Sequence, residues 1–193
     1  MEKTEEACDL FKLAKEYNLV SLMNLCRTYL RDINIEPDNV FSMLDVAEYT
    51  QDRSLRDRCF KLLEEGTRKV LAAYDLRDIT PAMVRIIVDL PKLALYSEYE
   101  LIKWLIDWAN AKVREGDTIC ENAREYLQKM LLFIDILSLT FEEFALLCKD
   151  YPDFFCSIEI ANIYLNIAYP GIREMPDWYD KEVKKRQYIG SKK

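Results

Sequence analysis

Glycine is nearly absent from this sequence. Only four glycines occur among the 193 residues, and six prolines add few further breaks. Because tight turns between β-strands depend on glycine at positive φ, a chain so poor in glycine has few ways to build a sheet. Half of the residues are apolar and 32% are charged, which is ordinary for a globular protein. We therefore predict an all-α fold, either one compact domain or an elongated helical array.

The N-terminal third of the chain contains one pattern twice. Five residues recur 33 positions later: Ala14, Ser21, Leu22, Cys26 and Leu30 return as Ala47, Ser54, Leu55, Cys59 and Leu63. The pattern suits a pair of packed helices, with a small residue where two backbones approach and apolar residues on the shared face. It predicts stacked antiparallel helical hairpins, which bury faces that neither hairpin buries alone. The alternative is coincidence in a chain rich in Leu and Ala, and the landmarks of ankyrin and tetratricopeptide repeats are missing.

Apolar spacing and capping residues place the helices of this part. Pro37 suits the first turn of a helix, Asp52 suits the N-cap of the next one, and Gly66 suits its end. The sequence therefore predicts helices at residues 4–16 and 19–31, a third that starts at Pro37, a fourth between Asp52 and Gly66, and a short helix after Gly66.

The rest of the chain continues the helical pattern. Ser97 and Glu100 have the spacing of a capping box before a long helix that ends just before Gly116. Trp104 and Trp108 lie on an apolar stripe of this helix, so we expect it to be central. Further helices are predicted from Thr80 and Pro81 onward, at 121–133, at 141–149 after a second capping box (Thr140, Glu143), and at 157–169. Residues 170–193 are expected to be a linker and a solvated basic tail.

The sequence offers little for catalysis. It has no histidine, which removes the commonest general base and metal ligand. The adjacent pairs Glu64/Glu65 and Glu142/Glu143 would point about 100° apart on a helix, so neither pair shares a site. The six cysteines form no CxxC pair and have no histidine to activate a thiolate, and no glycine-rich phosphate loop occurs. We expect no enzyme activity, no catalytic residue, no metal site and no cofactor.

Charge and cysteine usage limit the partners and the compartment. The formal net charge of −7 repels phosphate backbones, so we expect no nucleic-acid binding. The most apolar stretch, "MLLFIDILSL", contains Asp135 and is too short to cross a bilayer, so no membrane partner is expected. The cysteines lie within helical patterns and indicate reduced core residues of a cytoplasmic or nuclear protein.

Three stretches carry a resemblance to a known family. They are "LFKLAKEYNLVSLMNLCRTYL", "IEPDNVFSMLDVAEYTQDRSLRDRCFKLL" and "LYSEYELIKWLIDWA", with the motifs P-D-N-V-F, L-R-D-R-C and S-E-x-E-L-x-x-x-x-x-x-W. Together they are similar to the passage from a BTB (POZ) domain into a BACK domain, over residues 5–169. The resemblance implies the last helices of a BTB-like domain at 1–33, a helical pair termed the 3-box at 34–66, the remainder of a BACK-like helical array at 67–169, and a linker with a basic tail at 170–193.

The resemblance also implies a function. Proteins of this kind are substrate adaptors of cullin-RING ubiquitin ligases, in which the BTB domain binds cullin-three and a domain after BACK binds the substrate. The strands and the dimer interface of a BTB domain do not occur in this sequence. We therefore expect a fragment of a non-catalytic scaffold whose parent protein is a homodimer through its BTB core. The alternative is a free-standing helical-repeat protein that binds peptides in a concave groove.

Partner-binding residues follow from the same resemblance. In that family the 3-box forms a groove for the N-terminal extension of the cullin. Carried over to this sequence, the predicted contacts are Asn34, Ile35, Glu36, Asp38, Asn39, Ser42, Tyr49 and Gln51. For each of them, a purely structural role in a cap or turn is the alternative. Four neighbours are assigned to the core: Phe41, Leu44, Leu55 and Cys59.

Overall fold

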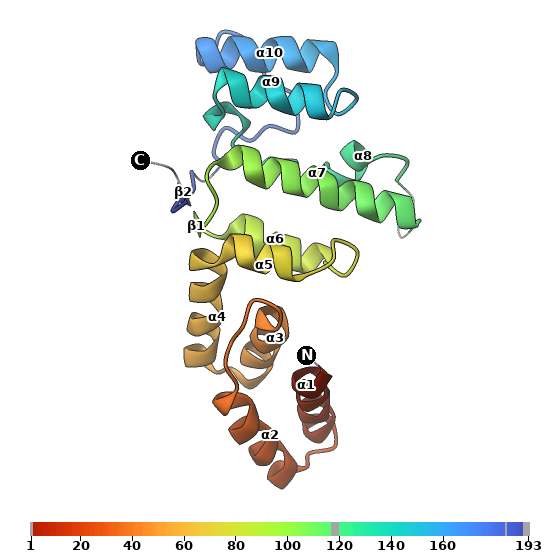
Figure 1. The fold of residues 1–193 in the computed structure, drawn as a ribbon, viewed down its shortest axis with the longest axis vertical. Helices are drawn as coiled ribbons and strands as arrows, with labels where there is room; N and C mark the ends of the chain where they lie inside the picture. The colour runs from red at the N-terminus through yellow and green to blue at the C-terminus, as the bar shows by residue number, and fades with distance from the viewer. Residues whose placement is uncertain (1, 117–119, 184, 191–193) are drawn as a thin grey trace. The chain divides into compact units, whose positions relative to one another are not determined.

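The computed structural model of the chain describes residues 2–116, 120–183 and 185–190. It is predominantly α-helical (Figure 1), which confirms the predicted all-α fold. The two described strands, β1 (Lys92–Leu93) and β2 (Gln187–Tyr188), have two residues each. The chain divides into two compact units, Met1–Tyr74 and Asp75–Lys193, termed unit 1 and unit 2.

Unit 1 is built from packed helix pairs. Its elements are α1 (Glu2–Glu16), α2 (Val20–Asp32), α3 (Val40–Thr50), α4 (Arg53–Glu65) and α5 (Thr67–Ala73). Helix α1 packs against α2 and α3, α3 packs against α4, and α4 packs against α5. The interior includes Phe11 and Met43, and the predicted core residues Phe41, Leu44, Leu55 and Cys59 are buried as well.

The predicted repeat extends to the backbone of the two turns in unit 1. Helices α1 and α3 end in the same pair of hydrogen bonds: Asn18 N to Lys15 O (3.0 Å) with Leu19 N to Ala14 O (2.7 Å), and Gln51 N to Glu48 O (3.3 Å) with Asp52 N to Ala47 O (2.9 Å). Asn18 and Gln51 have φ values of 53° and 56°, and they are the only non-glycine residues with positive φ in the described part of the chain. This is the Schellman arrangement of a helix end, at both copies of the pattern.

Burial follows the same correspondence. Both members of the pairs Ala14/Ala47, Cys26/Cys59 and Leu30/Leu63 are buried, whereas Ser21 and Ser54 are both exposed. Helices α1 and α2 thus correspond to α3 and α4 at four of the five repeated positions, whereas Leu22 is half-buried and its counterpart Leu55 is buried. Their stacking as antiparallel hairpins stays a prediction.

The turn at Gln51 allows a stabilising substitution. A left-handed backbone conformation costs free energy for a residue that has a Cβ atom, whereas glycine adopts it without this cost. Because the Gln51 side chain is exposed, Gln51→Gly should stabilise unit 1 by about 0.5–1 kcal/mol. Slower hydrogen–deuterium exchange of the α3 and α4 amides would be the measure. Gln51→Ala is the control and should bring no gain; equal gains from both changes would contradict the explanation.

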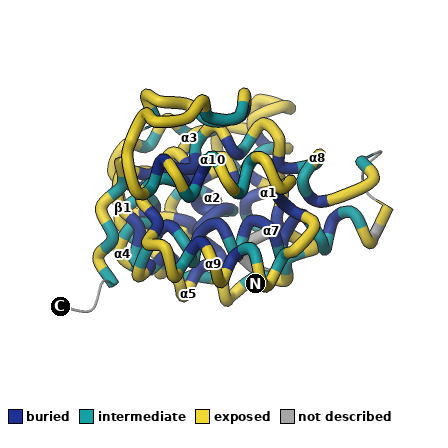
Figure 2. The backbone as a smooth tube through the Cα atoms, turned by 90° about the horizontal axis from the view of Figure 1, so that it is seen from above, coloured by how far each residue is buried: buried dark blue, intermediate teal, exposed yellow. Residues whose placement is uncertain are grey.

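Unit 2 is arranged around its longest helix. Its elements are α6 (Pro81–Asp89), β1, α7 (Glu98–Glu115), α8 (Ala123–Leu127), the 3-10 turns η1 (Leu131–Phe133) and η2 (Ile136–Ser138), α9 (Phe141–Asp150), α10 (Ser157–Ala168) and β2. Helix α7 packs against α8 and α9, and α10 packs against α9 and η2. Along α7, buried residues such as Leu101, Leu105 and Trp108 alternate with half-buried ones, dark blue and teal in Figure 2, and this agrees with its predicted central place within unit 2.

Several predicted helix caps are present. The Asp52 side chain accepts a hydrogen bond from Leu55 N at the start of α4, and Thr80 caps α6 with Pro81 in its first turn. At α9, Thr140 and Glu143 form the complete capping box. These caps satisfy backbone N–H groups that the helix itself leaves without partners.

One predicted helix start is wrong, and one predicted capping box is absent although its helix, α7, starts at Glu98 directly after Ser97 as predicted. Pro37 lies in a turn, and α3 begins only at Val40, because the Asn39 side chain holds the preceding residues in that turn. The Ser97 side chain does not cap α7. Its hydroxyl donates instead to the carboxylate of Glu143 on α9 at 2.6 Å, and Glu100 accepts from Tyr96 N at 2.8 Å. A hydrogen bond to a carboxylate is stronger than one between neutral groups, which explains why the Ser97 hydroxyl bonds to Glu143 and does not cap α7.

The helix predicted at 121–133 is also wrong in its extent. Helix α8 ends at Leu127, and tighter turns follow at η1 and η2. Ile134 and Ile136 are both buried.

The C-terminal segment differs most from its prediction. In place of a solvated linker, Trp178 is buried, and β2 pairs in parallel with β1, Lys92 opposite Gln187 and Leu93 opposite Tyr188. The Arg186 guanidinium forms an ion pair with Glu98 at 2.9 Å, and both side chains are at most 3% exposed. Residues 177–183 and 185–190 therefore belong to the folded body of unit 2.

Candidate functional site

The first three residues predicted to contact a partner lie together on unit 1. Asn34 and Glu36 are exposed and Ile35 is half-buried, in the segment between α2 and α3. With residues of α4, including Arg58 and Lys61, they line a cleft of about 450 Å³, termed the loop cleft. Asp38 is exposed in the following turn.

Asn39 has a structural role in this segment. It is 9% exposed, its side-chain oxygen accepts from Glu36 N at 2.9 Å, and its amide donates to Asn34 O at 3.1 Å. These bonds fix the backbone that presents Asn34 and Glu36. For Asn39 the structure thus shows the turn-holding role that the sequence left as the alternative.

The remaining predicted contacts lie elsewhere on α3. Ser42 is half-buried, whereas Tyr49 and Gln51 lie at the far end of the helix, about 15 Å from its start by helix geometry. The Tyr49 ring stacks under Lys15 Nζ, 3.9 Å from the ring centroid, and its hydroxyl donates to Lys12 O at 3.4 Å. Tyr49 therefore serves the contact between α1 and α3, and the predicted set does not form one continuous site.

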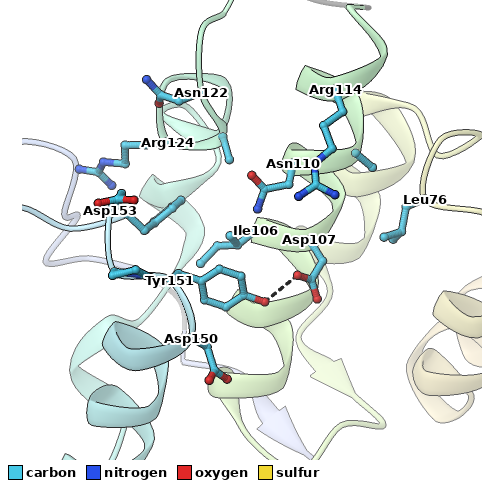
Figure 3. A pocket seen from close by; sticks show the side chains of 14 residues that line it. Leu76, Ile106, Asp107, Asn110, Arg114, Asn122, Arg124, Asp150, Tyr151 and Asp153 are labelled. Carbon is cyan, nitrogen blue, oxygen red and sulfur yellow. Dashed lines mark hydrogen bonds between the residues drawn. The ribbon is translucent and has the colours of Figure 1, made fainter.

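Unit 2 contains a larger cleft that the sequence did not reveal. It has a volume of about 600 Å³ and lies beside α7, the start of α8 and residues 150–154; we term it the α7 cleft (Figure 3). Its polar wall carries carboxylates, amides and guanidinium groups: Asp107, Asn110, Arg114, Asn122, Arg124, Asp150 and Asp153. The thin polar strip of α7, visible in the sequence as Asp107, Asn110 and Arg114, was the available signal.

A tyrosine and a carboxylate pair at the wall of the α7 cleft. Tyr151 and Asp107 point toward each other in Figure 3, and the Tyr151 hydroxyl donates to Asp107 at 2.6 Å. Burial, and then the hydrogen bond to Asp107, raise the pKa of Tyr151, so the phenol stays protonated. A protonated phenol bound to a carboxylate can orient a ligand, but it is not a general base near neutral pH.

The described residues form no metal centre. No group of three or more Cys, Asp or Glu side chains lies close enough to hold a metal ion within the part of the chain that the structure describes. In the same part, no helix is both long and apolar enough to span a membrane.

The cysteine thiols differ in exposure, which predicts their reactivity. Cys59 is fully buried, and burial raises its pKa to about 11, whereas Cys156 is exposed at the start of α10. Because the thiolate is the reactive form, iodoacetamide at about pH 8 should modify Cys156 first and leave Cys59 unmodified until unit 1 unfolds. Peptide mass spectrometry over time would measure both. Equal rates in the folded protein would contradict this assignment, and equal rates in denaturant are the control.

Unit 1 also exposes a group of large apolar side chains. They lie on α1, on α2 and between these helices, and are more than two-fifths exposed: Leu10, Leu13, Tyr17, Leu19, Val20, Leu25 and Tyr29. Leu10, Leu13 and Tyr17 follow one stripe of α1, and Leu25 and Tyr29 follow one stripe of α2. This set is termed the apolar surface.

Comparison with known proteins finds no matching family model, no matching curated protein and no matching solved structure. The resemblance to BTB and BACK domains therefore depends on the sequence motifs alone.

Proposed function

We propose that this chain is a non-catalytic scaffold of the BTB–BACK type, part of a substrate adaptor of a cullin-RING ubiquitin ligase. In this proposal, unit 1 belongs to the cullin-three-binding side, and unit 2 leads toward a domain that binds an unidentified substrate. The all-α fold, the ordered turn at residues 34–39 and the motifs of the sequence support it.

The apolar surface is the observation that carries the proposal. Leu13, Tyr17 and Leu25 are exposed by half or more. Large apolar side chains exposed in one region are typical of a surface that a partner covers, and less typical of a helix pair that stays uncovered. In the proposed parent protein, the BTB core covers the apolar surface of α1 and α2. The loop cleft stays open beside it, where Asn34, Ile35 and Glu36 face a partner.

A calorimetric titration with the N-terminal domain of cullin-three tests the proposal. We expect saturable binding by the parent protein with its BTB core, and we expect charge reversal of the exposed turn, Glu36→Lys with Asp38→Lys, to weaken this binding by at least about tenfold. The matched control is Asp45→Lys with Asp57→Lys, which changes the net charge equally at exposed positions of α3 and α4 outside the loop cleft. No saturable binding, or equal losses in both variants, would count against the adaptor function.

A helical-repeat protein that binds peptides is the second candidate. The matching ends of α1 and α3 favour it, because duplicated helix pairs are the units of such repeats. The α7 cleft, with groups of both charge signs, has the size of a ligand site. A selection from a random peptide library tests this candidate. Peptides that bind the chain but no longer bind the Asp107→Asn variant would favour it over the adaptor.

A further inference from the structure

Three arginines surround a second cleft of unit 1. Arg27 and Arg31 lie one turn apart on α2, and Arg58 lies on α4. The cleft has a volume of about 310 Å³ and is termed the arginine cleft. In the sequence, the spacing of Arg27 and Arg31 already places them on one helix face.

These guanidinium groups are poorly neutralised by the protein. Arg31 and Arg58 are exposed, and neither forms an ion pair or hydrogen bond with another described residue. Arg27 has only a 3.5 Å contact with the side-chain oxygen of Asn24 and lies 5.8 Å from the Phe11 ring centroid. The one carboxylate that lines the cleft, Asp52, accepts the capping hydrogen bond from Leu55 N at 3.1 Å. In a chain of net charge −7, three such cations around one cleft are unusual.

The other walls of the cleft define the shape of a ligand. Leu30, Val46 and Leu55, all buried, contribute its apolar part, and the exposed Ser54 contributes a hydroxyl group. Three guanidinium groups and one carboxylate leave a local charge of +2 (3 − 1 = 2). A phosphomonoester carries about −1.5 to −2 charges at neutral pH and three acceptor oxygens, whereas a carboxylate side chain carries one charge. Guanidinium groups pair with phosphate oxygens through two parallel N–H donors each.

We propose that the arginine cleft binds a phosphorylated serine or threonine of a protein segment, with the phosphate between Arg27, Arg31 and Arg58 and an adjacent apolar residue toward Leu30 and Val46. The apolar part of the cleft favours a protein segment over free phosphate, because inorganic phosphate has nothing to bury there. This inference does not depend on the adaptor function, since it uses a different partner chemistry and a cleft that shares only Arg58 with the loop cleft.

Fluorescence anisotropy with a labelled short peptide, phosphoserine between two leucines, tests the proposal on the full chain. Charge-assisted hydrogen bonds to the phosphate should make this peptide bind at least about tenfold more tightly than its serine counterpart, and more tightly than an aspartate counterpart. Arg31→Gln with Arg58→Gln should lower the affinity by at least about tenfold, and added salt should weaken binding.

Matched controls distinguish binding in the arginine cleft from nonspecific electrostatic attraction between the peptide and the protein. Arg53 and Arg58 both lie on α4, but only Arg58 lines the arginine cleft. Arg53→Gln and Arg58→Gln therefore each remove one positive charge, the first outside the cleft and the second within it. We expect Arg53→Gln to leave the affinity unchanged and Arg58→Gln to reduce it; equal effects would overturn the proposal. So would equal binding of the phosphorylated and unphosphorylated peptides, or no saturable binding. Displacement by inorganic phosphate at the same concentration as by unlabelled peptide would overturn the assignment to a protein segment. Circular dichroism confirms that each variant is folded.

Discussion

Replacing Arg186 with methionine should lower the free energy of unfolding of unit 2 by about 3–5 kcal/mol, because the change leaves the buried carboxylate of Glu98 without its counter-ion. In the folded protein, Glu98 also accepts hydrogen bonds from Asp135 N at 3.0 Å and from the Tyr188 hydroxyl. The Arg186 guanidinium donates in addition to the carbonyl oxygens of Val88 and Phe133. Removing Arg186 therefore leaves the Glu98 carboxylate without its counter-ion and the two carbonyl groups without this hydrogen-bond donor.

Tryptophan fluorescence during denaturant unfolding measures this effect selectively. All three tryptophans, Trp104, Trp108 and Trp178, lie in unit 2, so their signal follows that unit alone. The matched control is Lys185→Met, which removes the neighbouring exposed charge and should change stability by about 0.5 kcal/mol or less.

The double variant Glu98→Gln with Arg186→Met distinguishes the ion pair from simple loss of packing. Because it removes both charges, no uncompensated buried charge remains, and it should be less destabilised than Arg186→Met alone. A double variant that is less stable than Arg186→Met would contradict the importance of the buried charge.

Truncation of Trp108 to alanine should cost unit 2 about 3–5 kcal/mol. The Trp108 side chain is 1% exposed, its ring centroid lies 5.2 Å from that of Tyr126, and its indole N–H donates to Ile79 O at 2.9 Å. Alanine would leave a large cavity beside α7 and an unpaired buried carbonyl group. The fluorescence of Trp104 and Trp178 remains to follow the unfolding.

Two variants separate the parts of this effect. Trp108→Phe keeps a ring and removes the indole donor, so it should cost about 1–3 kcal/mol. Trp104→Ala is the matched control on the same helix: Trp104 is only half-buried, and its indole N–H has no hydrogen-bond partner within the described structure. It should cost clearly less than Trp108→Ala. Equal costs for the two alanine variants would contradict the central place of Trp108.

Local patterns in the sequence predicted the elements that depend on neighbouring residues. The capping box of Thr140 and Glu143, the N-cap at Asp52 and the burial of Trp108 each follow from residues within a few turns of one helix. The 33-residue repeat belongs to this group, because α1 with α2 and α3 with α4 each form a unit of nearby residues. The positive φ at Gln51, which lacks the glycine signal of a helix end, could be expected only from its equivalence with Asn18.

Contacts between distant residues could not be predicted in this way. Glu98 and Arg186 are 88 positions apart, and Ser97 and Glu143 are 46 positions apart, so no periodicity links them. A basic, aperiodic stretch suggested a solvated tail, although its Arg186 and Trp178 are buried. The arginine cleft was missed for the same reason, because Arg58 comes from a different helix than Arg27 and Arg31. Asn34, Ile35 and Glu36 line the loop cleft together, whereas the sequence could not show that the neighbouring Asn39 is turned inward.

The pairing of β2 with β1 also determines when unit 2 can complete its fold during synthesis. In unit 1, the Tyr49 hydroxyl reaches back 37 positions to Lys12, whereas in unit 2 Arg186 reaches back 98 positions to Val88. Closing such a long loop costs more chain entropy and is slow. On the ribosome, unit 1 can therefore fold as soon as it leaves the exit tunnel, whereas the carboxylate of Glu98 must wait for its counter-ion until almost the whole of this sequence has been translated. Until then nascent unit 2 is a natural client for chaperones that bind incompletely folded chains.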